Sequence, residues 1–140
     1  MISFSLIKLD IFYKIGDISV QDQNNSLNNE KIGIIGVGTI GGTLVEALIK
    51  NDISSREQIT GSTSHEDSAK EVSDKYGIDT TTDNQRVVKE ANIIVLAVEP
   101  QMIEKVLAGL GDSFDTDQLV ISVAAGITTE FIESRIEKEV

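Results

Sequence analysis

The stretch Ile32-Gly33-Ile34-Ile35-Gly36-Val37-Gly38-Thr39-Ile40-Gly41 decides how this chain folds. An apolar run of strand type leads into a Gly-x-Gly-x-x-Gly turn, and the helical pattern Leu44, Ala47, Leu48 follows. In such a unit the first glycine permits a tight turn, the second lets the backbone approach a pyrophosphate, and the third lets the helix pack closely on the strand. The helix N-terminus adds unpaired N–H groups and a partial positive charge. The stretch therefore predicts a dinucleotide-binding turn.

The rest of the chain supplies the context that a glycine turn alone lacks. After Lys31, short apolar runs alternate with amphipathic stretches, the pattern of βα units on a parallel sheet. The pattern predicts strands at Lys31–Gly36, Gln58–Ser62, Ile78–Thr81, Asn92–Val98 and Leu119–Ala124, and helices at Thr39–Lys50, His65–Tyr76, Asn84–Glu90, Gln101–Gly109 and Thr129–Glu139. We predict an α/β protein with a doubly wound parallel sheet, a Rossmann-type dinucleotide-binding fold in three α/β/α layers. The alternatives are a purely structural glycine turn and a βα fold that does not bind nucleotides.

Several helix ends are marked by the residues that usually occupy them. Ser64 and Asp67, three residues apart, resemble a capping box, and Asp83 is placed to cap the third helix. Gly77 is placed to end the second helix, and Pro100 stands where a first turn accepts proline. These marks support the predicted helix boundaries.

The first thirty residues differ in composition from the rest. Residues 21–30 are almost wholly polar and rich in Asn, which predicts a linker. Residues 2–20 are rich in Ile and Phe, but they carry Lys8 and Asp10 and are too short to span a bilayer. This segment is an added edge strand, a disordered tail, or the product of a wrongly chosen start codon. We therefore divide the chain into an extension and linker at 1–30, which need not be ordered and is dispensable for nucleotide binding, and a nucleotide-binding domain at 31–140.

Composition excludes several classes of function. The 140 residues suffice for one domain, and 23 acidic against 12 basic residues give a net charge of −11, which disfavours nucleic acid and anionic membranes. Cysteine is absent, so disulfides, thiolate metal sites and cysteine nucleophiles are excluded, and a reduced cytoplasm fits. His65 is the only histidine, so no metal site is expected.

The end of the second predicted strand bears on which nucleotide binds. NAD-specific sites place an acidic residue about 20 residues past the glycines, where it bonds the ribose 2′-hydroxyl. Here that position holds the hydroxyl residues Ser62–Ser64, and no acid appears before Glu66. Three hydroxyls, the N–H groups that open the second helix and a protonated His65 could receive a 2′-phosphate. The alternative for His65 is an exposed residue in the first turn of a helix, without a functional role. The segment favours NADPH and leaves NADH as the alternative.

Four segments resemble the N-terminal domain of the pyrroline-5-carboxylate reductase family. They are the glycine-turn segment 32–42, Thr81-Thr82-Asp83-Asn84, Leu96-Ala97-Val98-Glu99-Pro100-Gln101, and Val120-Ile121-Ser122-Val123-Ala124-Ala125-Gly126-Ile127-Thr128. Their order and spacing agree with the family over residues 31 to about 138, and the combination is more specific than the glycine motif alone.

The resemblance implies a role for each segment. The turn would wrap the pyrophosphate, Ser62 would touch the 2′-phosphate region and Asn84 the adenosine, while the remaining segments would carry the ribose and nicotinamide. The cofactor-binding residues indicated by the turn and the resemblance are Ile35, Gly36, Val37, Gly38, Thr39, Ile40, Gly41, Ser62, Asn84, Ala97, Val98, Pro100, Ala124, Ala125 and Gly126. No catalytic residue is assigned.

The chain departs from the family in three ways. Glu99 stands where the family usually has lysine, and Thr39-Ile40 replaces the usual Asn-Met. The sequence also ends at Val140, before the family's next strand and its helical C-terminal domain, which supplies the dimer interface and the substrate-binding residues.

We therefore expect the NADPH-binding part of an oxidoreductase that reduces 1-pyrroline-5-carboxylate to proline. We expect the small-molecule substrate to be held only when a C-terminal domain is present, in the same chain or in a partner chain, so that the chain alone does not turn over. The rivals are another NADP-dependent reductase, such as a deazaflavin-dependent one, and a nucleotide-binding module without turnover.

Overall fold

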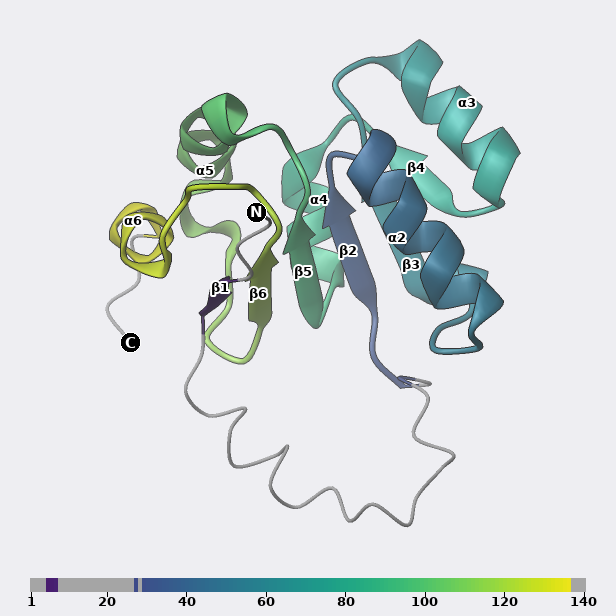
Figure 1. The fold of residues 1–140 in the computed structure, drawn as a ribbon, viewed down its shortest axis with the longest axis horizontal. Helices are drawn as coiled ribbons and strands as arrows, with labels where there is room; N and C mark the ends of the chain where they lie inside the picture. Colours follow the sequence, from purple (N-terminus) through teal and green to yellow (C-terminus); the bar gives the residue numbers. More distant parts are fainter. Residues whose placement is uncertain (1–4, 8–26, 28, 137–140) are drawn as a thin grey trace, which may run out of the picture.

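The computed structural model describes residues 5–7, 27 and 29–136, and every strand predicted after residue 30 is present in it. The strands are β1 (Ser5–Ile7), β2 (Ile32–Ile35), β3 (Ile59–Ser62), β4 (Asp79–Thr81), β5 (Ile93–Leu96) and β6 (Leu119–Ser122). They form one six-stranded sheet in the order β1-β6-β5-β2-β3-β4 (Figure 1). All pairs are parallel except that between β1 and β6. The predicted doubly wound α/β fold is confirmed.

The register of the sheet brings the carboxyl ends of the strands into one row. Ile35 at the end of β2 pairs with Ser62 of β3 and with Leu96 of β5. Leu96 in turn pairs with Ser122 of β6, and Ser62 pairs with Thr81 of β4. Because the chain leaves β2 toward β3 and later returns to β5 on its other side, the order reverses at β2. That switch point is where open α/β sheets bind their ligands.

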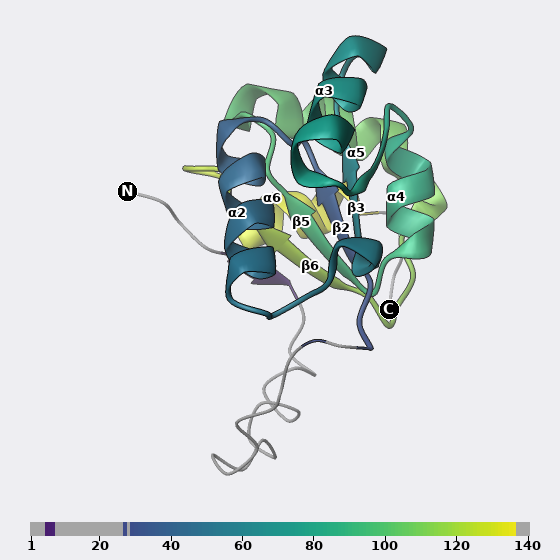
Figure 2. The same ribbon diagram turned by 90° about the vertical axis from the view of Figure 1, so that its right-hand side faces the viewer.

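Helices cover both faces of this sheet. They are α2 (Thr39–Lys50), α3 (Glu66–Tyr76), α4 (Asn84–Glu90), α5 (Ile103–Leu110) and α6 (Thr129–Arg135), with single 3-10 turns η1 (Arg56–Gln58), η2 (Pro100–Met102) and η3 (Gly111–Ser113). Figure 2 shows α2 and α4 on opposite sides of the strands. None of the described helices is long and apolar enough to cross a membrane.

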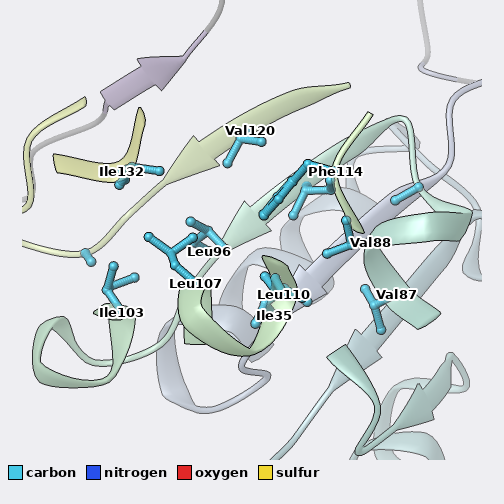
Figure 3. Packing of buried hydrophobic residues seen from close by; sticks show 13 residues of the cluster. Ile35, Val87, Val88, Leu96, Ile103, Leu107, Leu110, Phe114, Val120 and Ile132 are labelled. Carbon is cyan, nitrogen blue, oxygen red and sulfur yellow. The ribbon is translucent and has the colours of Figure 1, made fainter. Parts of the chain in front are cut away.

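The larger core cluster lies between the sheet and the helices α4, α5 and α6. Alternate residues of the strands, including Ile35, Leu96 and Val120, meet buried side chains of these helices such as Leu107 and Ile132 (Figure 3). Each of these five side chains is at most 5% exposed. The packing fixes the position of β5 and β6 relative to β2, and with it the loops that follow them.

The second cluster lies on the other face, beneath α2. Ile34 and Val95 point to this side, where they pack with Val45 of α2 and Ile78. The strict alternation along β2, with Ile34 on one face and Ile35 on the other, explains why its sequence is apolar throughout.

The structure confirms most of the predicted helix ends. The Asp83 carboxylate accepts hydrogen bonds from the N–H groups of Gln85 and Arg86 at 3.0 and 3.2 Å. Gly77 ends α3 in the left-handed conformation, with φ of 69°. Pro100 stands in the first turn of η2.

The capping box predicted at Ser64 and Asp67 is wrong. Helix α3 begins at Glu66, and its N-cap is His65, which makes no side-chain capping bond. The Thr63 hydroxyl donates to the carbonyl of His65 at 3.0 Å, and this local turn keeps Ser64 outside the helix. Two other helices differ at their ends. A 3-10 turn precedes α5, and α6 ends at Arg135, with Ile136 as its extended C-cap, while 137–139 of its predicted span lie outside the described residues.

The described part of the N-terminal extension contacts the domain. Ser5–Ile7 form an added edge strand that pairs antiparallel with β6, Ser5 opposite Ser122 (Figure 1). Leu27, the only apolar residue of the predicted linker, packs on the second cluster and donates its N–H to the carbonyl of Ile53 at 2.9 Å. At Leu27 the predicted linker therefore contacts the domain, which a purely connecting segment would not do. Residues 21–26 and 28 lie outside the described residues.

Candidate nucleotide-binding site

The turn between β2 and α2 needs glycine at two positions for structural reasons. Gly36 has φ of +89°, and a Cβ there would lie 2.5 Å from Cγ1 of Val98. Only glycine tolerates both the left-handed backbone and this close approach. A Cβ on Gly41 would lie 2.4 Å from the carbonyl oxygen of Gly36, so α2 packs directly on the turn. The first and third glycines thus have the tight-turn and close-packing roles that the motif predicts.

Gly38 has a different environment, because an added Cβ would meet nothing within 4 Å. It is the N-cap of α2 without a side-chain capping bond, and the first turn of the helix carries no acidic residue. The first N–H groups of a helix have no partner within it. The N–H of Gly38 itself donates to the carbonyl of Gly36 at 3.0 Å, so the backbone donors that can meet a pyrophosphate are those of the first turn of α2, beside the open space at Gly38. The exposed side chain of Ile40, 51% accessible, follows on the same turn.

Ser62 lies beneath the turn. Its side chain is 1% exposed, and its hydroxyl oxygen accepts a hydrogen bond from the N–H of Gly36 at 3.3 Å. Its carbonyl accepts the N–H groups of Gly36 and Val37 at 3.2 and 2.8 Å. The hydroxyl is thus engaged with the turn, and the more accessible residues that follow, Thr63 to His65, present their surface to the pocket.

A pocket of about 480 Å³ opens over the carboxyl ends of β2, β3 and β5. It is lined by Ile35, Gly36, Val37, Gly38, Ser62, Thr63, Ser64, His65, Ser68, Thr82, Asn84, Ala97, Val98, Glu99, Met102 and Val106. On the β3 side of β2 the lining is polar, with hydroxyl residues around the start of α3, and on the β5 side it includes the apolar residues Val98, Met102 and Val106. A purine ring with a polar ribose needs such a pair of surfaces.

The pocket brings together about half of the residues that the sequence indicates. Those that line it are Ile35, Gly36, Val37, Gly38, Ser62, Asn84, Ala97 and Val98. Thr39, Ile40, Gly41, Pro100, Ala124, Ala125 and Gly126 do not line it. Ala124, Ala125 and Gly126 follow β6, whose end is aligned with the end of β5, so they lie at the same edge of the sheet but beyond this pocket.

Sequence reasoning missed Ser68, Met102 and Val106, which come from the first turn of α3, from η2 and from α5. The pocket is also lined by Thr63, Ser64, His65, Thr82 and Glu99, which are noted in the sequence but not assigned to the cofactor-binding set. Met102 and Val106 are four residues apart, a helical spacing that also describes core positions. The spacing alone therefore cannot separate a pocket wall from the core.

The electrostatics of the pocket are unusual for a phosphate site. Among the described lining residues, Glu99 and His65 are the only ones with ionisable side chains, and none is lysine or arginine. The Glu99 carboxylate accepts a short hydrogen bond from the amide of Gln101. In the described part of the chain, no cluster of three or more histidine or acidic residues could hold a metal ion.

Comparison with known proteins places these features in a family. A family described as "NADP oxidoreductase coenzyme F420-dependent" matches residues 31–126, which include the whole pocket. The chain belongs to this family of NADP-dependent oxidoreductases. The matched segment runs from β2 to the loop after β6, so it spans the five parallel strands and leaves out β1.

Individual relatives of the chain have a more specific name. The chain is 38% identical over 110 residues to the pyrroline-5-carboxylate reductase of Methanosarcina acetivorans, covering 79% of this chain and 41% of that protein. It is 36% identical over 101 residues to the enzyme of the same name from Escherichia coli, covering 72% of this chain and 38% of that one. The chain therefore spans about two fifths of the length of these relatives.

Solved structures agree with the sequence comparison. The pyrroline-5-carboxylate reductase structure from Coxiella burnetii superimposes with a TM-score of 0.73 and 33% identity, covering 79% of this chain and 41% of that chain. The resemblance recognised in the sequence is thereby confirmed, at the level of the family's N-terminal NADP-binding part.

Proposed function

We propose that this chain is the NADPH-binding part of an oxidoreductase that reduces 1-pyrroline-5-carboxylate to proline. The observation that carries the proposal is the pocket, since its lining combines an open helix N-terminus, a hydroxyl-rich end and an apolar wall at the switch point of the sheet. The names of the relatives at 36% and 38% identity supply the substrate.

In this proposal each part of the pocket binds one part of the nucleotide. The N–H groups in the first turn of α2, after Gly38, bind the pyrophosphate. Val98, which the resemblance places with the ribose and nicotinamide, packs instead with Met102 and Val106 on the adenine. The segment Thr63–His65 receives the ribose and its 2′-phosphate. Bound NADPH supplies the hydride for the C=N bond of the imine, and the protein positions it.

The nicotinamide end would lie outside the described pocket, along the small residues that follow β5 and β6. Ala97 lines the pocket at its border, and Ala124 to Gly126 continue the same edge of the sheet. Small side chains let a ring lie flat on the backbone there. These assignments, with those of Thr39, Ile40, Gly41 and Pro100, remain predictions from the sequence.

Binding of the imine is assigned to residues beyond this pocket. The imine carries a carboxylate, yet the described pocket lining contains no lysine or arginine to pair with it. Because the relatives are more than twice as long as the matched segment, we propose that a helical domain, in the same or a partner chain, holds the substrate. A cytoplasmic location belongs to the proposal, since the absence of cysteine from the sequence is consistent with a reducing compartment.

One observation favours a second candidate. The family description names coenzyme F420, a deazaflavin, so a reductase that exchanges hydride between NADP and a deazaflavin is the alternative. A nucleotide-binding module without turnover is the third possibility.

A paired assay tests the proposal. The 140-residue chain should bind NADPH, measured by nicotinamide fluorescence, and should fail to form proline from the imine. Positioning of the reacting groups contributes about 7–11 kcal/mol to catalysis, so its loss makes turnover undetectable. Adding a helical domain from a complete relative should restore proline formation. Robust proline formation by the chain alone would show that the substrate site is misplaced, and hydride transfer to a deazaflavin but not to the imine would favour the alternative.

A further inference from the structure

We propose that His65 is the residue that selects for the 2′-phosphate, and that the preference of this protein for NADPH over NADH therefore rises as the pH falls. The inference rests on the proposed nucleotide-binding function and adds to it the residue that sets its selectivity. It follows from the charges in the pocket, their hydrogen bonds and the position of His65.

The pocket lacks a permanent positive charge where selectivity for a phosphate would need one. NADPH differs from NADH only by the 2′-phosphate, which carries a charge of about −1.5 to −2 at pH 7. Of the described lining residues, only His65 can become cationic, and Glu99 is anionic. Arginine and lysine are the residues that usually bind phosphates, and they are absent from this described lining.

The elements that meet near His65 are predominantly acidic. The charged groups in the first part of α3, at the N-cap of α4 and in the pocket lining after β5 are Glu66, Asp67, Lys70, Asp83 and Glu99. Three of these carboxylates are already hydrogen-bonded: Glu66 accepts the Thr82 hydroxyl at 2.8 Å, Asp83 caps α4, and Glu99 accepts from Gln101. A phosphate dianion that enters this end meets no positive charge from the pocket lining unless the imidazole is protonated.

The position of His65 suits contact with a phosphate. It is exposed, it is the N-cap of α3 in an extended conformation, and its side chain makes no capping bond with the helix. Its backbone is fixed, because its carbonyl accepts the Thr63 hydroxyl and the N–H of Ala69, each at 3.0 Å. A fixed backbone with an uncommitted ring places a titratable donor at the rim of the pocket, beside the hydroxyls of Thr63 and Ser64.

The expected pH dependence follows from the charge of the ring. Histidine is the side chain whose charge changes between about pH 5 and 8. If the imidazolium contacts the phosphate, NADPH binding takes up a proton, so the contact is present at the acidic end of this range and is lost as the pH rises. The phosphate itself titrates near pH 6, which weakens binding at still lower pH. A comparison with a variant that lacks the imidazole separates the two titrations.

The test measures dissociation constants for NADP⁺ and NAD⁺ by calorimetry between about pH 5.5 and 8.5, the range of histidine titration. Between the alkaline and the acidic end of this range, the ratio of NADP⁺ affinity to NAD⁺ affinity should rise about fivefold more in the wild type than in His65→Asn. This is the size of effect that a partly exposed charge pair gives. His65→Arg should keep a high ratio at every pH. Glu99→Gln should raise the ratio at every pH and leave its pH dependence in place.

The outcomes separate this inference from the proposed function. Equal pH dependence in the wild type and in His65→Asn, with both nucleotides bound, would overturn the role of His65 and leave nucleotide binding standing. If neither nucleotide binds to any variant at any pH, both proposals fail. An NADP⁺/NAD⁺ affinity ratio that gains its pH dependence only when the imidazole is present supports the inference, because a merely structural role of His65 would change both affinities equally.

Discussion

The hydroxyl of Ser62 accepts a hydrogen bond from the N–H of Gly36 at 3.3 Å, which joins the end of β3 to the first glycine of the turn. Ser62 is also 1% exposed, so this contact is shielded from water. The residue that the sequence assigns to the 2′-phosphate therefore supports the turn that would hold the pyrophosphate. Selectivity at the ribose then depends on the accessible residues that follow it.

Support of the glycine turn and selectivity for the 2′-phosphate can be separated by substituting Ser62 and Ser64. Ser64→Asp places a carboxylate at the exposed, polar end of the pocket, so NADPH should bind about tenfold more weakly while NADH is retained, because like charges repel. Ser62→Ala should weaken both nucleotides by a similar, smaller factor, since it removes a support of the turn. Fluorescence titration with both nucleotides measures the ratio. If Ser62→Ala alone changed the NADPH/NADH ratio, its hydroxyl would contact the phosphate after all.

Nucleotide binding should depend on the open space at Gly38. Gly38→Val projects a branched side chain into the place where a pyrophosphate would approach, so NADPH binding should be lost while the fold is kept, because a Cβ there meets nothing within 4 Å. Gly109→Val is the matched control, since Gly109 is equally open but lies outside the pocket. Circular dichroism checks the fold of both variants. Unchanged NADPH affinity in Gly38→Val would remove the turn from the binding site.

The cap of α4 should contribute to stability. Asp83→Ala leaves the N–H groups of Gln85 and Arg86 without their carboxylate, so the free energy of unfolding should fall by about 1 kcal/mol. Asp83→Asn is the control, because asparagine caps helices about as well as aspartate does. Urea denaturation measures both. Equal destabilisation by the two substitutions would indicate that the charge, and not the cap, is what matters.

The N-terminal extension should stabilise the domain without taking part in binding. Deleting residues 1–26 removes the pairing of β1 with β6 but keeps Leu27, and no lining residue of the pocket lies before Ile35. NADPH affinity should therefore stay unchanged, while the thermal midpoint of unfolding should fall. Leu27→Ala in the full chain tests the other contact. Because Leu27 is only partly buried, the free energy of unfolding should fall by less than the roughly 2–5 kcal/mol that truncating a fully buried leucine costs. A deletion that abolishes NADPH binding would contradict the domain boundary at residue 31.

Much of the fold could be predicted because it depends on local patterns. The alternation of apolar runs located all five parallel strands, and the residues Asp83 and Gly77 marked helix ends by their own chemistry. The capping box at Ser64 was predicted wrongly because Thr63 forms a competing hydrogen bond with the carbonyl of His65, and sequence spacing cannot rank two such turns. The edge strand β1 depends on a partner at the far end of the chain, so no local signal could choose it among the alternatives.

The candidate site was predictable to the extent that the strands end in register. The turn and the segments after β3 and β5 meet because Ile35, Ser62 and Leu96 are aligned across the sheet. The pocket walls from Met102 and Val106 depend on how η2 and α5 are oriented, which the sequence pattern does not specify. The burial of Ser62 likewise depends on the rotation of its side chain toward Gly36.

The pairing of β1 with β6 has a consequence for how the chain folds. β1 precedes the parallel strands in the sequence and pairs with β6, which follows them, Ser5 opposite Ser122, whereas each parallel pair joins strands that are closer in sequence. Contacts between distant segments form slowly, because the long intervening loop must be closed before any pairing stabilises it. We therefore expect the βα units to assemble first during synthesis, with β1 added only after Leu119–Ser122 has emerged. Between the emergence of β6 and the docking of β1, β6 presents a free edge on which a strand of another chain could pair.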